Sequence, residues 1–414
     1  MPEKKRFWTP TGAYDFNLII DDLDYSQDLL NVKILTSITV PYQTVLLTLN
    51  LDPDDIILKR VYGQSPIKLT VILQGAANEL NKESIDFELI YLTSEFDIPT
   101  RSMTTQDVQK DRTKVTIPTV CQIPFEYMTT MVNNVHHAKK IDEIIEDIVG
   151  NTGAELDLET TGLNTNTLDQ VVIPPSTVYK CIQYLDRLFG IYNGIAIITC
   201  HYDGTLLIKN LNQNMNMSQT FTMYQLADND KDFQKIADKC ADGKHFYTSK
   251  HVNTTYSANV MFSVLSPTLR YIVKPRDTLY HTIEKDLNDF CLEYGLLSNK
   301  ETEIYHNTTG IKTDKRITYY KDQTGYDTDD TFINANLSKA VSSLVTLSMD
   351  LDRDMMILNL MNVGESVSFI SKTLEMNQFS NKYILKSSEI NFNKSGTWQG
   401  SARVHLIRTN RSSN

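Results

Sequence analysis

The first hundred residues alternate between apolar and polar positions, which is the pattern of strands with one buried face. In 44–51 every second side chain is apolar, from Val45 to Leu51, and 67–73 repeats the alternation. A third alternating stretch, around Phe87, follows a polar loop. Several short strands separated by turn residues predict a small antiparallel barrel or sandwich in this part of the chain.

The middle of the chain changes to a helical period. Apolar side chains recur on one face over 141–150 and again over 178–189, and a glycine ends each stretch. The two apolar faces are Ile141, Ile144, Ile145, Ile148 and Val149, then Val178, Cys181, Ile182, Leu185 and Phe189. A β-hairpin with an Asp-Gly turn is predicted over 195–211. We therefore expect an α+β unit here.

The second of these helices is preceded by Pro174-Pro175-Ser176-Thr177. An extended residue before proline, followed by proline in the first helical turn, is a common way to begin a helix. We therefore predict that the helix begins at the proline pair. A docking edge for a partner protein or a neighbouring subunit is the alternative interpretation of the same residues.

The pattern weakens after residue 212. A helix is predicted over 278–294 from its apolar spacing, and 321–330 is an Asp-rich stretch without the spacing of an EF-hand loop. Alternation returns at 345–351 and 366–371, and 382–393 with 398–408 reads as a hairpin.

These patterns together predict a β-rich α+β protein. We expect two antiparallel β domains that bracket an inserted α+β domain and a long irregular connection. The expected division is a first β domain at 1–115, an α+β insertion at 116–211, a connecting region with helices at 212–340, and a second β domain at 341–414.

Composition restricts the possible functions of the chain more than it restricts the possible folds. The chain has 414 residues and a net charge of −11, which argues against a surface built to bind phosphates. Apolar runs such as 195–198 are too short to cross a bilayer, so no membrane-spanning segment is expected. The basic start of the chain is not followed by an apolar stretch, so we expect no secretory signal and folding in the cytoplasm.

Cysteine and histidine give no metal-binding pattern. The five cysteines lie far apart in the sequence, which favours reduced thiols in the core. They are Cys121, Cys181, Cys200, Cys240 and Cys291. His136 and His137 are adjacent and should point in opposite directions. No catalytic, cofactor-binding or metal-binding residue is assigned, and no cofactor is expected.

One short motif suggests chemistry. The stretch 157–164, DLETTGLN, resembles the opening motif of the DEDD exonucleases, in which an Asp and a Glu hold two catalytic metals. Asp157 and Glu159 could supply half of such a site. However, a turn rather than an apolar strand precedes them, and the only His-x4-Asp block, His137 to Asp142, comes before the motif instead of after it. We therefore treat a metal-dependent exonuclease as the alternative function and expect a chain that is not an enzyme.

Two stretches carry a wider resemblance. One is VVIPPST at 171–177, which leads into IQYLDRLFGIY at 182–192. The other is VGESV at 363–367, followed by KYILKSSE at 382–389 and LIRTN at 406–410. With the β-rich beginning, the chain resembles the central baseplate hub proteins of contractile-tailed phages. Relatives of that family include the late control protein and the hub part of type VI secretion spikes.

The resemblance implies a structural virion protein located in the tail baseplate and assembled in the host cytoplasm. It implies a homotrimer in which each chain contributes two tube domains, so that six copies join a hexameric tail tube to a trimeric central spike. The implied partners are the central spike protein and a tail tube or tube-initiator protein, with the tape measure protein as a further candidate. An acidic lumen would let DNA pass without specific binding, because like charges repel over about a Debye length, ~10 Å. A glycan hydrolase and a generic β-rich binding module are the remaining alternatives.

Overall fold

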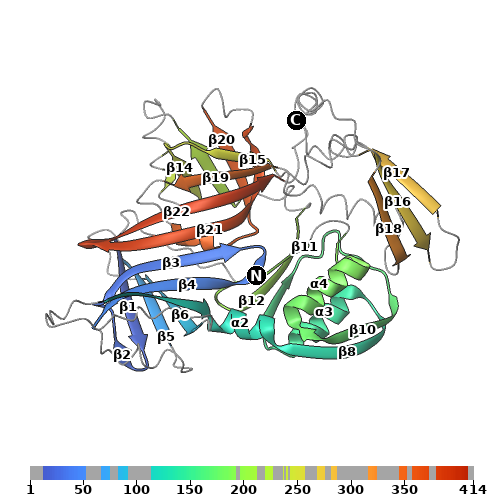
Figure 1. The fold of residues 1–414 in the computed structure, drawn as a ribbon, viewed down its shortest axis with the longest axis horizontal. Helices are drawn as coiled ribbons and strands as arrows, with labels where there is room; N and C mark the ends of the chain where they lie inside the picture. The colour runs from blue at the N-terminus through green and yellow to red at the C-terminus, as the bar shows by residue number, and fades with distance from the viewer. Residues whose placement is uncertain are drawn as a thin grey trace, which may run out of the picture.

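The computed structural model describes most of the chain and shows a β-rich protein with few helices (Figure 1). The described residues are 13–52, 67–74, 83–91, 113–192, 196–211, 220–226, 236, 239–240, 243–256, 268–275, 281–286, 316–323, 345–351, 357–372 and 379–408. The expected fold class, an α+β protein dominated by antiparallel strands, is confirmed.

Eight antiparallel strands close into a barrel, which we call the first β module. Around the barrel the order is β21-β3-β4-β7-β6-β5-β1-β22, and β22 pairs with β21 to complete the circle. The bounds are β1 (Ala13–Ile20), β3 (Leu29–Ser37), β4 (Val40–Leu51), β5 (Ile67–Gln74), β6 (Glu83–Tyr91), β7 (Thr113–Cys121), β21 (Asn381–Ser395) and β22 (Thr397–Arg408). A two-residue strand, β2 (Leu23–Asp24), pairs with the end of β1. Closure removes the exposed strand edges of this module.

The interior of the barrel explains the alternation in the sequence. In β4 the predicted apolar positions from Val45 to Leu51 are all buried. Aromatic rings fill the space where the two ends of the chain meet: the ring centroid of Phe392 lies 4.7 Å from Tyr14, and that of Phe16 lies 4.4 Å from Trp398. A barrel of eight strands is just wide enough for side chains to fill it, so this interior is a packed core.

The hairpin of β21 and β22 also pairs with strands outside the barrel, which extend the same sheet and which we call the second β module. On the β21 side it adds β20 (Ser366–Ser371), β13 (Phe221–Gln225) and β14 (His245–Thr248), and on the β22 side β19 (Val345–Leu351) and β15 (Asn253–Tyr256). Residues 387–393 of β21 pair with β3, whereas 381–384 pair with β20. The Thr248 hydroxyl donates to the Asp350 carbonyl at 2.7 Å, which connects β14 to β19. One hairpin therefore belongs to both β modules.

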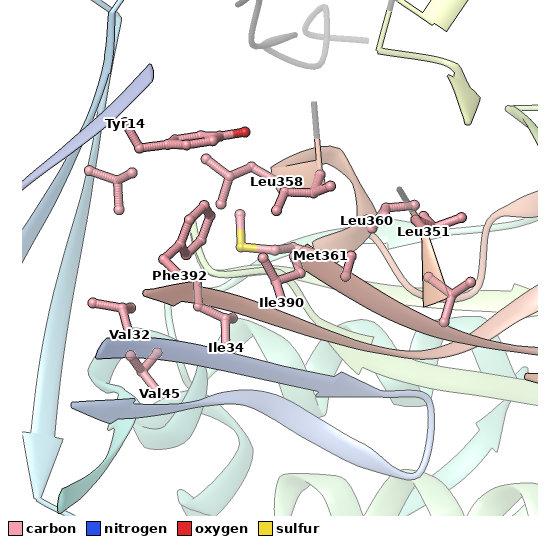
Figure 2. Close-up of a cluster of buried hydrophobic side chains, with 14 of the residues drawn as sticks. Tyr14, Val32, Ile34, Val45, Leu351, Leu358, Leu360, Met361, Ile390 and Phe392 are labelled. Carbon is pink, nitrogen blue, oxygen red and sulfur yellow. The ribbon is translucent and has the colours of Figure 1, made fainter. Parts of the chain in front are cut away.

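A short 3-10 helix, η2 (Ile357–Met361), lies where the two modules join (Figure 2). All five of its residues are buried, and Leu358 and Met361 lie beside Phe392 and Ile390. The Ser388 hydroxyl donates to the Leu360 carbonyl at 2.7 Å. Gly400 lies close against this helix: a Cβ there would come within 2.6 Å of the Ile357 side chain, which would have to shift. The helix therefore joins the interiors of both modules into one hydrophobic core.

The α+β insertion leaves the barrel after β7 and has a hydrophobic core of its own. Its elements are α2 (Gln122–Thr129), β8 (Met131–Lys139), α3 (Ile141–Gly150), β9 (Glu155–Leu158), β10 (Leu168–Thr177), α4 (Val178–Phe189), β11 (Ala196–Cys200) and β12 (Thr205–Asn210). Strands β8 and β10 form an antiparallel pair, and β11-β12-β9 form a separate sheet in which β9 runs parallel to β12. In Figure 1, α3 and α4 lie close to both of these sheets.

Both predicted helices of the insertion are confirmed residue by residue. The buried residues of α3 and α4 are the ten apolar positions that define the two helical faces in the sequence. The predicted start of α4 is wrong, however. Pro174 and Pro175 belong to β10, where the register with β8 shifts between Ile173 and Ser176, and Thr177 caps the helix by accepting from the backbone N–H of Lys180. Proline lacks an N–H group, so a strand irregularity accommodates it as well as a helix start does.

Three further strands form a small sheet of their own, in the order β17-β16-β18. They are β16 (Thr268–Pro275), β17 (His281–Asp286) and β18 (Arg316–Gln323). The helix predicted over 278–294 is therefore wrong at 281–286, because β17 pairs with β16 and this non-local partner overrides a weak helical pattern. The first residues of the Asp-rich stretch, 321–323, end β18, and its remainder lies outside the described residues.

Strand pairing crosses the expected domain boundaries. The strands of 221–256, placed by the sequence in the connecting region, are hydrogen-bonded to β20 and β19 of the second module. The hairpin that was expected only in a C-terminal tube domain also closes the N-terminal barrel. The first module is wholly antiparallel, whereas β13 runs parallel to both of its neighbours.

Candidate assembly surface

The acidic motif at 157–164 helps to hold two strands of the insertion together. Asp157 pairs in register with Leu207 of β12, so the motif begins in a parallel strand pair. The carboxylate of Glu159 accepts the backbone N–H of Asn210 at 2.8 Å, and the Tyr192 hydroxyl donates to the Glu159 carbonyl at 2.9 Å. Burial raises the pKa of Glu159, against the opposing effect of the Asn210 hydrogen bond. These contacts fasten β9 to β12.

Asp157 and Glu159 lie near each other, and the described part of the chain adds no further candidate ligand beside them. Among the described residues, no three His, Cys, Asp or Glu side chains lie close enough together to hold a metal ion. A two-metal hydrolase needs more carboxylates than this pair supplies. The exonuclease alternative therefore gains no support from the described part of the chain.

The histidine and cysteine predictions agree with the structure where it describes them. His136 is buried while His137 is exposed. The His136 Nδ1 lies 3.4 Å from a carboxylate oxygen of Asp147, which also pairs with Lys139, and burial lowers the pKa of His136. Cys121, Cys181, Cys200 and Cys240 are free and buried, and Cys291 lies outside the described residues.

The insertion is firmly seated on the hairpin that the two modules share. Ile197 and Leu211 of the insertion pack with Ile384 and Ile407 on the outer face of the hairpin. The Gln43 side-chain amide donates to the Cys200 carbonyl at 2.8 Å, which connects β4 to β11. The sequence gives no local sign of these contacts, because each isolated residue fits an ordinary strand.

A buried ion pair adds to this attachment. Lys209 on β12 lies 3.1 Å from the carboxylate of Glu365, which precedes β20. The second oxygen of that carboxylate accepts from the Thr220 hydroxyl at 2.7 Å. Glu365 is only 7% exposed, so the interaction is largely shielded from solvent. Its geometry fixes the insertion relative to the second module.

Charges of alternating sign cross the outer face where the modules join. Lys33 on β3 pairs with Glu389 on β21 at 2.7 Å, and Arg403 on β22 donates to Asp350 on β19 at 2.6 Å. Glu389 and Arg403 are direct cross-strand partners, so the four side chains follow four successive strands. The Arg403 hydrogen bond lowers the pKa of Asp350. Each cation in this row has a carboxylate beside it, which leaves little positive charge for a phosphate group.

The insertion exposes an apolar strip on the outer face of β8 and β10. Val135 and Val172 are direct cross-strand partners and are 48% and 53% exposed, and Met131 is 63% exposed. Exposed apolar side chains gathered in one place are typical of interaction sites. Among the described residues, no helix is long and apolar enough to span a membrane.

Comparison with known proteins gives a fold and no sequence family. No protein-family model matches the sequence, and no curated protein matches it. The fold is similar to that of the 43 kDa tail protein of prophage MuSo2 from Shewanella oneidensis, with a TM-score of 0.55 at 10% identity over 95% of this chain and 98% of that one. It is similar to the tail protein from Neisseria meningitidis MC58, with a TM-score of 0.54 at 10% identity over 96% of both chains.

A weaker likeness, with a TM-score of 0.44 at 8% identity, is to the E. coli c3393 protein, a component of the type VI secretion system. It covers 94% of this chain and 76% of that one, and it is too weak to carry weight. The two stronger likenesses place the chain in the class of proteins with the phage tail protein fold. The tail-protein fold that the resemblance implied is thus confirmed over nearly the whole chain.

Proposed function

We propose that this chain is a structural protein of a phage tail that forms the central baseplate hub. In this role it is a homotrimer that joins a hexameric tail tube to a trimeric central spike and lets DNA pass through its lumen. The observation that carries the proposal is the pair of β modules connected through one hairpin, in a fold shared with two phage tail proteins.

Symmetry explains why a trimeric hub would have two β modules in each chain. Three copies of a chain with one module have three equivalent wall segments, whereas three copies with two similar modules have six. A six-part ring on a three-fold axis can meet a hexameric tube on one side and a trimeric spike on the other. The shared hairpin and η2 hold the two modules at a fixed angle, which such an adaptor requires.

Electrostatics supports passage of DNA without binding. The net charge of −11 and the row from Lys33 to Asp350, in which cations alternate with carboxylates, both disfavour retention of phosphate groups. The lumen wall, in this proposal, is acidic or self-neutralised. We assign no catalytic role and no cofactor to the chain, and the spike, the tube or tube-initiator protein and the tape measure protein are its proposed partners in the virion.

The oligomeric state tests the proposal most directly. Sedimentation velocity of the purified full chain should give a species of three times the chain mass, and negative-stain images should show a ring with a central passage. When the protein is incubated with short duplex DNA at 150 mM salt, no complex of the two should form. A strict monomer over the micromolar range, or a trimer without a passage, would contradict the hub assignment.

A further inference from the structure

A groove lies between the insertion and the first β module. It has a volume of about 690 Å³ and is bounded on one side by α4 and on the other by Ile38 and Thr39, next to the start of β4. Ala196 and Ile198 of β11 contribute apolar surface to its lining. The Tyr179 hydroxyl donates to the Thr39 carbonyl at 3.3 Å across the groove. This hydrogen bond connects the two sides of the groove directly.

The wall that α4 presents to this groove is cationic. Lys180, Gln183, Tyr184 and Arg187 are spaced as one helical stripe and all line the groove. In the described part of the chain, no carboxylate pairs with the Lys180 ammonium or the Arg187 guanidinium. Asp186 also lines the groove, but its carboxylate accepts the backbone N–H of Ile191 at 3.3 Å. Arginine and tyrosine over an apolar floor are the residue types that dominate protein interfaces.

The same unit carries the opposite charge on α3. Its solvent side holds Asp142, Glu143, Glu146 and Asp147. Two of these are engaged within the helix region: Glu143 accepts the backbone N–H of Lys140 at 2.9 Å, and Asp147 pairs with Lys139. Within the described residues, the half-buried Asp142 accepts the N–H of its neighbour Glu143 and makes no ion pair, and Glu146 is exposed and has no partner. Their carboxylates are available to a cation from outside.

We propose that the acidic face of α3, through Asp142 and Glu146, docks against the α4 groove of a neighbouring copy, at Lys180 and Arg187. The two helices pack their apolar faces on one common core, so their charged faces point outward and do not neutralise each other within a chain. Complementary surfaces at different places on one chain form a head-to-tail contact, and such contacts close into a ring when the rotation allows it. The inference rests on the proposed trimer and names the surfaces that hold it together.

A second copy fits this groove better than nucleic acid does. Two separated cations on a chain of net charge −11 give little attraction for a polyanion, which needs several phosphate contacts for useful affinity. The carboxylates of Asp142 and Glu146, one turn apart on α3, match the two cations in number and in sign. The interface should also weaken as ionic strength rises, because its charges lie at the protein surface.

Charge reversal and rescue test the pairing. One variant carries Lys180→Glu with Arg187→Glu, a second carries Asp142→Lys with Glu146→Lys, and a third carries all four changes. Each of the first two should raise the concentration for half-maximal trimer about tenfold or more, measured by sedimentation velocity at 50 mM salt. In the variant with all four changes, the concentration for half-maximal trimer should return to within about threefold of its value in the unaltered chain. Lys114→Glu and Glu88→Lys, at exposed positions of the barrel, are the matched controls and should have no effect.

The outcomes separate this interface from the hub assignment. If the unaltered chain is monomeric, the proposed function fails and the interface fails with it. If the trimer forms but neither reversal weakens it, or the combined variant is not rescued, the interface is wrong while the trimer stands. Binding of an added DNA duplex that Lys180→Glu with Arg187→Glu abolishes would also overturn it.

A crosslink keeps the test decisive if a reversed variant does not fold. Glu146→Cys with Arg187→Cys in one chain should give a covalent trimer ladder with a short bis-maleimide reagent. Each single cysteine variant should give none, which controls for the native thiols. Absence of the ladder from a folded trimer would contradict the docking geometry.

Discussion

The β modules and the α+β insertion are built by opposite routes. The insertion is a continuous stretch whose helices follow from their own sequence spacing, and its core is formed almost wholly by residues between Met128 and Ile208. The first β module instead closes only when β1 and β3 meet β21 and β22, with Asn31 hydrogen-bonded to Asn391 at the other end of the chain. One unit depends on local sequence, and the other on both ends of the polypeptide.

This difference predicts how each unit responds to damage. A defect in the insertion core should remain within the insertion, because few strands of the modules depend on it. A defect where the chain ends meet should open the barrel and, through η2, the second module as well. The four changes below probe these units, starting with the largest expected effect.

Phe392→Ala should lower the free energy of unfolding by about 3–5 kcal/mol. The Phe392 ring packs against Tyr14 and Phe16 where the barrel closes. It also lies next to Gly400, as does Ile357 of η2. Hydrogen exchange should show loss of protection in β1 and β19 together, since both modules share one core.

Ile182→Ala is the matched change in the insertion, where Ile182 is fully buried in α4. It should cost about 2–5 kcal/mol, with exchange increased first within 122–211. Equal loss of protection across the whole chain in both variants would remove the distinction between the two units.

Glu365→Gln should weaken the attachment of the insertion to the second β module by about 1–3 kcal/mol. The change leaves the Lys209 ammonium, which is largely buried, without its counter-charge. Chemical denaturation would measure the loss of stability, and hydrogen exchange at β12 and β20 would show where it occurs. Lys33→Met, which breaks the more exposed pair with Glu389, is the control and should cost under about 1 kcal/mol. A cost no greater than that of the control would show that the buried pair does not hold the units together.

Glu159→Gln should give the smallest effect, a gain of a few tenths to about 1 kcal/mol at pH 7. Burial raises the pKa of Glu159 in the folded protein, so ionisation opposes folding above that pKa. As pH falls towards the ordinary carboxyl range, the glutamate becomes protonated and the cost disappears. The advantage of glutamine should therefore shrink between pH 7 and pH 4 in thermal melts. An advantage that grows on acidification would contradict the assigned direction of the pKa shift.

The candidate assembly surface was only partly predictable. The acidic face of α3 and the helix that carries Lys180 and Arg187 both follow from helical spacing, so the two charged faces could be drawn from the sequence. The groove could not, because Ile38 reaches α4 only after the insertion is seated on the barrel. Asp157 and Glu159 show the reverse case: their spacing suggested metal chemistry, and their neighbours made them part of a strand joint.

The errors share a physical cause. The Pro174-Pro175 pair satisfies either a helix start or a strand irregularity, and the partner strand β8 decides between them. Residues 281–286 have spacing compatible with a helix, yet pairing with β16 makes them a strand. Short patterns are ambiguous wherever a distant segment can supply the hydrogen bonds.

The sequence by itself determined the local elements: the two amphipathic helices, the hairpins at 196–210 and 381–408, and the alternating faces of the long strands. Periodicity specifies these because a helix or a hairpin satisfies its hydrogen bonds within a short stretch of chain. Only the tertiary structure decided that one hairpin would serve two β modules and that the chain ends would close one barrel. The pairings that close the barrel join residues 350 or more positions apart, and no short stretch contains the partner that each of these strands needs.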